Sequence, residues 1–103
     1  MFNDAQKTIL KKSILRYGDS AQVEMAIEEM AELTKALLKH RRAKQFGQYD
    51  VDKVRDNVSE EIADVLIMLE QLQMIFCNRC QVERIIGEKI ERQAKRLAAE
   101  SEV

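Results

Sequence analysis

Few positions in this chain can interrupt a helix, because the sequence contains no proline and only three glycines among its 103 residues. Glu, Lys, Leu, Ile and Ala are common, and aromatic residues account for only 5% of the chain. This composition favours helices over strands, so the chain is expected to be all-α. Its length is that of one domain, which predicts a single all-α domain over residues 1–103.

Periodicity and the glycines divide the chain into helices at about residues 4–17, 19–40, 52–75 and 82–99. Gly18 ends the first helix, and Asp19 or Ser20 caps the second. Residues 41–49 are predicted to be a basic loop or a frayed helix end, and residues 77–81 a turn. Short connections favour an antiparallel four-helix bundle. A chain this short buries a limited fraction of its surface, so we expect the bundle to be completed by oligomerisation.

Each of the first three helices has an apolar face that is expected to point inward. In the first helix this face holds Ile9, Leu10, Ile14 and Leu15. In the second it holds Val23, Ala26, Ile27, Met30, Leu33, Leu37 and Leu38. In the third it holds Val54, Val58, Ile62, Val65, Leu69, Leu72 and Phe76.

The charge balance excludes several classes of partner. The net charge of -1 provides no general attraction to nucleic acid or to an anionic membrane surface. The first four residues do not resemble a signal peptide, and no apolar run approaches the roughly 20 residues that span a bilayer. We therefore expect a soluble, cytoplasmic protein that binds neither nucleic acid nor membrane.

The two cysteines form a Cys-x-x-Cys motif at Cys77 and Cys80. A thioredoxin-type redox pair would need a strand-to-helix context, which the sequence does not show. A zinc site would need two further Cys or His ligands, and His40 is the only histidine. The preferred interpretation is a pair of free thiols in a loop, with a zinc site shared between two subunits as the alternative.

Two acidic clusters carry the functional information, at residues 28–32 (EEMAE) and 60–64 (EEIAD). Glu29 and Glu32 are three residues apart, so they project from nearly the same side of their helix, at the edge of its apolar face. Glu61 touches the apolar face of the third helix, and Asp64 lies within the apolar stretch at residues 62–69. A solvated rim could explain the first cluster, and salt bridges to Lys or Arg of another helix could explain the second.

Four carboxylates on adjacent antiparallel helices repel one another unless a cation lies between them. Because all four predicted ligands are oxygens, Mg²⁺ is the expected metal, with Mn²⁺ as a possible substitute. Glu-x-x-His pairs of the di-iron type and a glycine-rich phosphate loop are both missing from the sequence. Magnesium held by few carboxylates usually completes its shell with substrate phosphates, which indicates phosphoryl or nucleotidyl transfer to water. Basic residues after the first cluster and along the fourth helix could supply fixed charge for those phosphates.

The two clusters, in this order and with 28 residues between Glu32 and Glu61, resemble the all-α nucleoside triphosphate pyrophosphohydrolases of the MazG type. The flanking sequences EEMAELTKAL and EEIADVLI are also similar to that family, and the resemblance covers about residues 20–96. It implies a Mg²⁺-dependent enzyme that hydrolyses a nucleoside triphosphate to the monophosphate and pyrophosphate. In that reaction, a metal-bound water attacks the α-phosphorus.

The resemblance also implies roles for individual residues. Glu29, Glu32, Glu61 and Asp64 would be the catalytic metal ligands, and Glu28 an additional acidic residue near them. Phosphate contacts would come from Lys35 and from the last helix, through Lys89, Gln93 and Arg96. Gln93 stands where the family often has asparagine, which changes the reach of that amide. The family forms dimers or tetramers, so a homodimer or homotetramer is expected.

Two other functions remain open at this stage. The first is a non-catalytic helical module that binds a protein partner or a nucleotide. The second is a related phosphohydrolase that uses the same metal site on another phosphorylated metabolite.

Overall fold

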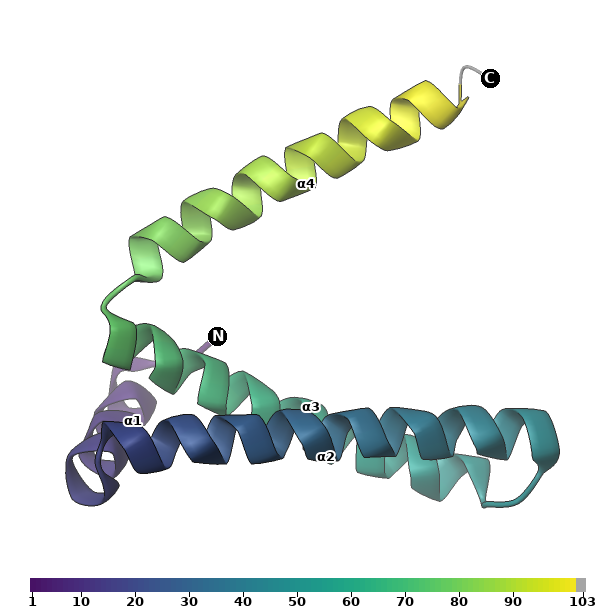
Figure 1. The fold of residues 1–103 in the computed structure, drawn as a ribbon, viewed down its shortest axis with the longest axis horizontal. Coiled ribbons are helices and arrows are strands. Elements are labelled where there is room, and N and C mark those ends of the chain that lie inside the picture. Colours follow the sequence, from purple (N-terminus) through teal and green to yellow (C-terminus); the bar gives the residue numbers. More distant parts are fainter. Residues whose placement is uncertain (102–103) are drawn as a thin grey trace.

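The computed structural model describes residues 1–101, and these form four helices and no strand. The helices are α1 (Asp4–Tyr17), α2 (Asp19–Phe46), α3 (Val51–Phe76) and α4 (Arg79–Ser101), as Figure 1 shows. The prediction of an all-α chain with four helices is therefore confirmed. None of these helices is both long enough and apolar enough to cross a membrane.

Local caps explain where α1 begins and ends. The side chain of Asn3 accepts a hydrogen bond from the Gln6 N–H at 2.8 Å, and the Gln6 side chain accepts one from the Asn3 N–H at 2.9 Å. This reciprocal pair is a capping box, which satisfies two amides that the first helical turn leaves free. Gly18 follows α1 with a φ of 92°, a left-handed value that side chains disfavour, so the chain turns there into α2.

Helix α2 continues to Phe46, so the prediction of a loop or frayed end over residues 41–49 is wrong for residues 41–46. Ala43 is 3% exposed, and its burial holds this last part of α2 in the fold. Gly47 then ends the helix in the left-handed conformation, where its N–H donates to the Ala43 carbonyl at 3.1 Å. The connection to α3 is only residues 47–50.

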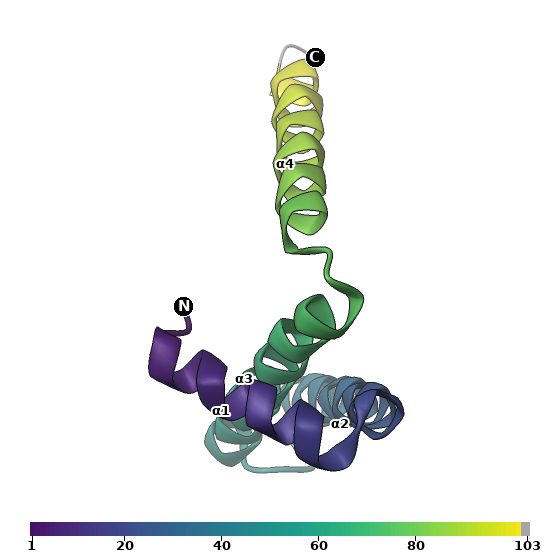
Figure 2. The same cartoon turned by 90° about the vertical axis from the view of Figure 1, so that its left-hand side faces the viewer.

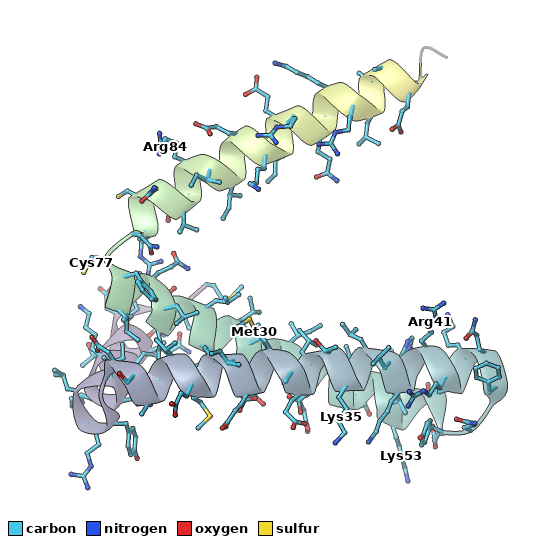
Figure 3. All side chains as sticks on the ribbon, viewed as in Figure 1. Met30, Lys35, Arg41, Lys53, Cys77 and Arg84 are labelled. Carbon is cyan, nitrogen blue, oxygen red and sulfur yellow. The ribbon has the colours of Figure 1, made fainter. Side chains whose placement is uncertain are left out.

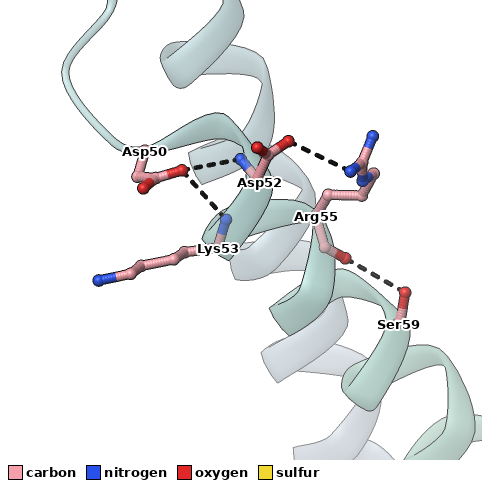
Figure 4. A network of polar contacts seen from close by, with 5 residues as sticks. All are labelled: Asp50, Asp52, Lys53, Arg55 and Ser59. Carbon is pink, nitrogen blue, oxygen red and sulfur yellow. Dashed lines mark hydrogen bonds and ion pairs between the residues drawn. The ribbon is translucent and has the colours of Figure 1, made fainter.

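The start of α3 is fixed by the polar network in Figure 4. The carboxylate of Asp50 accepts hydrogen bonds from the N–H groups of Asp52 and Lys53 at 3.0 and 3.3 Å. Arg55 donates to Asp52 at 3.2 Å, and the Ser59 hydroxyl donates to the Arg55 carbonyl at 3.2 Å. Asp50 thus supplies the acceptor that a helix N-terminus needs, and α3 begins one residue earlier than predicted.

Helices α2 and α3 run antiparallel, side by side, while α1 crosses them near one end (Figures 1 and 2). Each helix has a row of buried or half-buried residues separated alternately by four and three residues. This is the residue spacing of a coiled-coil seam. In α2 these positions are Gln22, Ala26, Glu29, Leu33, Ala36, His40 and Ala43. In α3 they are Val54, Val58, Glu61, Val65, Met68, Leu72 and Ile75. Three alanines at the seam allow the two backbones to approach closely.

The apolar faces predicted from the sequence are only partly buried within one chain. Ile9 and Leu15 of α1 are 61% and 86% exposed. Of the four residues expected on the inner face of α1, only Leu10 and Ile14 are half-buried. The stretch at residues 62–69 was expected to be buried on several sides. Val65 and Met68 are buried, but Ile62, Ile67 and Leu69 are 43%, 37% and 40% exposed. Apolar surface remains free because α2 and α3 use a narrow seam rather than their whole apolar faces.

Helix α4 projects away from the other three helices, and among them it contacts α3 alone (Figures 1 and 2). The four helices therefore do not close into a bundle within one chain. An ion pair anchors the first turn of α4, where the Arg79 guanidinium donates to the carboxylate of Glu70 on α3. The side chain of Glu70 is only 7% exposed, so Arg79 provides the countercharge for a buried carboxylate.

Replacing Arg79 with methionine is expected to lower the free energy of unfolding by about 1–3 kcal/mol, because the buried Glu70 carboxylate loses its partner. Thermal and denaturant unfolding would measure this loss. Arg84→Met is the matched control, since Arg84 lies on the exposed side of α4 in Figure 3 and forms no ion pair with residues 1–101. Equal stability of both variants would contradict an anchoring role for the ion pair.

Candidate metal centre

Three carboxylates from two helices converge at the α2–α3 contact. Glu29 comes from α2, and Glu61 and Asp64 come from α3. One carboxylate oxygen of each lies within 4.8 Å of the others. Across the part of the chain that the structure describes, this is the only group of three or more acidic, histidine or cysteine side chains with such a spacing.

The seam of α2 and α3 explains why these side chains meet. Glu29 and Glu61 occupy seam positions that otherwise hold mainly small or apolar residues, and both are half-buried. Asp64 follows Glu61 by three residues, so it lies on the same side of α3, and it is exposed to solvent. Helix packing therefore fixes two of the three carboxylates, and the third is open to solvent.

Burial and mutual repulsion raise the pKa of two carboxyl groups of the cluster. Burial raises the pKa of the Glu29 carboxyl above its usual range, and the negative charges of Asp64 and Glu61 raise it further. The pKa of Glu61 is raised in the same way, first by burial and then by the charge of Asp64. Both carboxylates are thus harder to ionise in the fold than in water, as expected for acidic groups packed together without a cation.

No basic side chain compensates these charges. The ion pairs found within residues 1–101 join Asp52 to Arg55, Glu70 to Arg79 and Glu91 to Lys95, and none involves the cluster. The Oε2 atom of Glu61 is buried and has no hydrogen-bond partner. The alternative of salt bridges to another helix is therefore absent from this arrangement, and the cluster offers several oxygen atoms to a cation.

The fourth predicted ligand, Glu32, lies near this centre but does not join the group within 4.8 Å. It is exposed on α2, and its charge contributes to the raised pKa of both Glu29 and Glu61. Glu28 likewise adds to the raised pKa of Glu29. Both residues are thus near enough to affect the electrostatics, although neither is brought together with the other carboxylates.

The predicted phosphate contacts lie apart from one another. Lys35 is exposed on α2, where Figure 3 shows it on the opposite side from Met30. Lys89, Gln93 and Arg96 are exposed on α4, which makes no contact with α2. A single chain therefore does not bring these three residues to the carboxylates.

The Cys-x-x-Cys motif lies at the junction of α3 and α4. Cys77 caps the end of α3 with a left-handed φ of 51°, and Cys80 is in the first turn of α4. Both thiols are free and exposed, as predicted, although only Cys77 lies outside a helix. No further zinc-ligating residue joins them within the described residues, so a zinc site would need a second chain.

Three buried polar residues were not expected from the sequence, namely Gln22, Glu70 and Gln71, which are 8%, 6% and 3% exposed. The sequence has an arginine nine residues after Glu70, within the predicted turn, and this arginine could have suggested an ion pair with Glu70. Small and apolar residues in α2 are separated alternately by four and three residues. This spacing could have predicted that Glu29 lies on the seam. Comparisons with family models, with curated proteins and with solved structures gave no match to this chain.

Proposed function

We propose that this chain is a Mg²⁺-dependent hydrolase that converts a nucleoside triphosphate, with ribose or deoxyribose, to the monophosphate and pyrophosphate. The observation that carries the proposal is the convergence of Glu29, Glu61 and Asp64, with carboxylate oxygens within 4.8 Å and no cationic partner. Attack of water on the α-phosphorus is the reaction that the sequence resemblance implies for such a centre.

The residues present suit a hard divalent cation. All the available donors are carboxylate oxygens, which Mg²⁺ prefers and Mn²⁺ also accepts. The buried, unpartnered Oε2 of Glu61 is a position at which a cation would relieve an electrostatic cost. When bound, the metal would supply positive charge against the phosphates and lower the pKa of water. We assign Glu29, Glu61 and Asp64 as ligands, with Glu32 as the fourth.

The chain's own residues would hold and orient the substrate. Glu29 and Glu61 stand on packed helices, which keep the ligands in place without a flexible loop. Lys35 is our candidate for a phosphate contact on α2. Because α4 contacts only α3 in a single chain, Lys89, Gln93 and Arg96 reach the carboxylates only in an assembly of chains or after α4 reorients. The proposal therefore includes a homodimer or homotetramer.

The proposed reaction is tested by its products. The full chain would be incubated with Mg²⁺ and a panel of canonical and modified nucleoside triphosphates, and pyrophosphate and orthophosphate would be measured separately. Equal amounts of pyrophosphate and nucleoside monophosphate are expected. Orthophosphate as the only product would contradict attack at the α-phosphorus and would favour another phosphohydrolase reaction.

A non-catalytic helical binding module is the second candidate, and the exposed apolar side chains of α4 favour it. Ile86, Ile90 and Leu97 are 50%, 60% and 58% exposed, so α4 has surface available for a partner. This candidate predicts no turnover across the nucleotide panel and no Mg²⁺ binding by calorimetry. Turnover that depends on the carboxylates would exclude it.

A further inference from the structure

The junction between α3 and α4 carries reactive groups that the proposed activity does not use. Helix α3 ends at Phe76 and α4 begins at Arg79, so only residues 77 and 78 connect the two helices. Cys77 is the C-cap of α3, at the junction in Figure 3, and Cys80 lies in the first turn of α4. One thiol therefore stands on each side of the connection.

Both thiols are open to reagents in solution, since they are free and exposed. The Cys77 Sγ donates to the Met74 carbonyl at 3.5 Å, and an S–H group is only a weak donor. Little stabilisation is therefore lost when Cys77 reacts. Accessible cysteines in Cys-x-x-Cys motifs are the ones that commonly undergo redox chemistry, whereas buried structural cysteines are inert.

The two cysteines are also placed to react with each other. Asn78 is the N-cap of α4, because its carbonyl accepts a hydrogen bond from the Val82 N–H at 2.9 Å. Cys77 thus precedes the cap, and Cys80 is the second residue of the helix. A bond between residues this close in the sequence closes a small ring at the start of a helix, as in the Cys-x-x-Cys motifs of redox proteins. Here that ring would span the junction of two helices.

Zinc binding is the other common use of paired thiols, and the structure offers less for it. A structural zinc site needs four ligands. Within residues 1–101, no histidine, carboxylate or further cysteine joins Cys77 and Cys80 in a group that could hold a metal ion. A disulfide needs no third group, so the two residues at the junction are sufficient for it.

We propose that Cys77 and Cys80 form a reversible intrachain disulfide that locks the connection between α3 and α4. The oxidant is a small disulfide, such as glutathione disulfide. The thiolate of one cysteine attacks a sulfur of the small disulfide, breaks its S–S bond and releases one small thiolate. The thiolate of the other cysteine then attacks this mixed disulfide, which forms the Cys77–Cys80 bond and releases the second small thiolate. The two protons of the cysteines pass to the two released thiolates.

The bond acts on the segment that sets the direction of α4. Within residues 1–101, α4 contacts α3 alone, so the junction is what holds it. The ring would contain Asn78 and Arg79, and Arg79 also forms the ion pair with Glu70. A cross-link excludes the open conformations that the free chain can adopt. Oxidation is therefore expected to restrict local opening at the junction, and reduction to restore it. This inference rests on the junction and not on the proposed activity.

Mass spectrometry tests whether the bond forms. The full chain would be incubated with glutathione disulfide, and the wild type is expected to lose two hydrogen atoms without retaining glutathione. Trypsin cuts after Arg79, between the two cysteines, so the peptides that carry Cys77 and Cys80 should stay joined until a reductant is added. Cys77→Ser and Cys80→Ser are the matched controls, and each should instead retain one glutathione. A wild type that stays reduced, keeps its glutathione or is linked only between chains would overturn the proposal.

Amide hydrogen exchange tests whether the bond locks the junction. The Val82 N–H donates to the Asn78 carbonyl at 2.9 Å, and the Asn78 N–H donates to the Gln73 carbonyl at 3.3 Å. Both amides are expected to exchange several-fold more slowly in the oxidised chain, because exchange requires local opening. The amides of α1 are the internal control and should exchange equally in the two forms. Equal exchange at the junction in the oxidised and reduced chains would also overturn the proposal.

Discussion

Glu61→Gln should reduce the rate of pyrophosphate release by at least about 100-fold, which corresponds to about 2.7 kcal/mol of transition-state stabilisation. Glutamine keeps the size of the side chain but removes a negative charge that would hold the proposed cation. The variant should fold well, because the charge it removes repels Glu29 and Asp64. The rate would be measured as kcat/KM with saturating Mg²⁺ and the best nucleotide of the panel.

Glu60→Gln is the matched control for this result. Glu60 is the adjacent residue in α3, it is exposed, and it does not belong to the carboxylate group within 4.8 Å. The same change of charge at residue 60 is expected to leave the rate within a few-fold of wild type. Equal losses in both variants would indicate a general effect of charge, and an active Glu61→Gln variant would remove Glu61 from the metal site.

Removal of the metal is expected to have the second large effect. At a Mg²⁺ concentration 100 times the dissociation constant, binding to the folded state alone adds about 2.7 kcal/mol to the free energy of unfolding. For a domain of about 100 residues, chelation with EDTA should then lower the melting temperature by about 10 °C or more. The expected stabilisation has a simple origin, since a cation at the proposed centre would neutralise Glu29, Glu61 and Asp64, which form no ion pair within residues 1–101.

Scanning calorimetry at constant protein concentration, with Mg²⁺ or with EDTA, measures this difference. Glu61→Gln should lose most of the response to Mg²⁺, whereas Glu60→Gln should keep it. Calcium and manganese at the same concentration would show whether the centre discriminates between hard cations. A wild-type melting temperature unchanged by Mg²⁺ would argue against a metal centre, whatever the nucleotide assays show.

Without metal, stability should also depend on pH with a defined sign. The pKa values of Glu29 and Glu61 are raised in the folded state, so the folded chain holds more protons than the unfolded chain as pH rises from about 4.5. Their contribution to stability is therefore complete below the unfolded pKa and is lost as pH rises through the raised folded values. In EDTA, wild type should lose stability as pH rises above about 4.5, relative to a Glu29→Gln/Glu61→Gln variant. Parallel pH profiles of the two proteins would contradict this linkage.

Helix formation was predictable because local chemistry decides it. Residues 4–17 were assigned to α1 from their apolar periodicity and Gly18, and the structure places the helix there. The end of α2 was missed because the basic residues after His40 read as a loop, whereas burial of Ala43 against the fold keeps the helix going to Gly47. A charged run can remain helical when one small residue in it packs against a neighbouring helix.

The meeting of Glu29, Glu61 and Asp64 was also within reach of the sequence. The two carboxylate pairs lie on neighbouring antiparallel helices, and the contact between these helices brings three of the four carboxylates together. Glu32 and the side chains of α4 were harder to place, since the sequence does not specify the angle between α3 and α4. That angle depends on a tertiary ion pair, Arg79 with Glu70, and the spacing of these two residues in the sequence does not determine its geometry.

The projecting α4 also acts mechanically as a lever. Its 23 residues extend about 35 Å from the junction at Asn78, so a rotation of about 10° there displaces its tip by about 6 Å. That lateral displacement is about as large as the pitch of one helical turn, about 5.4 Å, so the far end of α4 would face a different part of any surface it contacts. Small changes in the torsion angles of residues 77 and 78 are thereby amplified with distance. The two residues between α3 and α4 therefore control alignment at Leu97, some 20 residues farther along the chain.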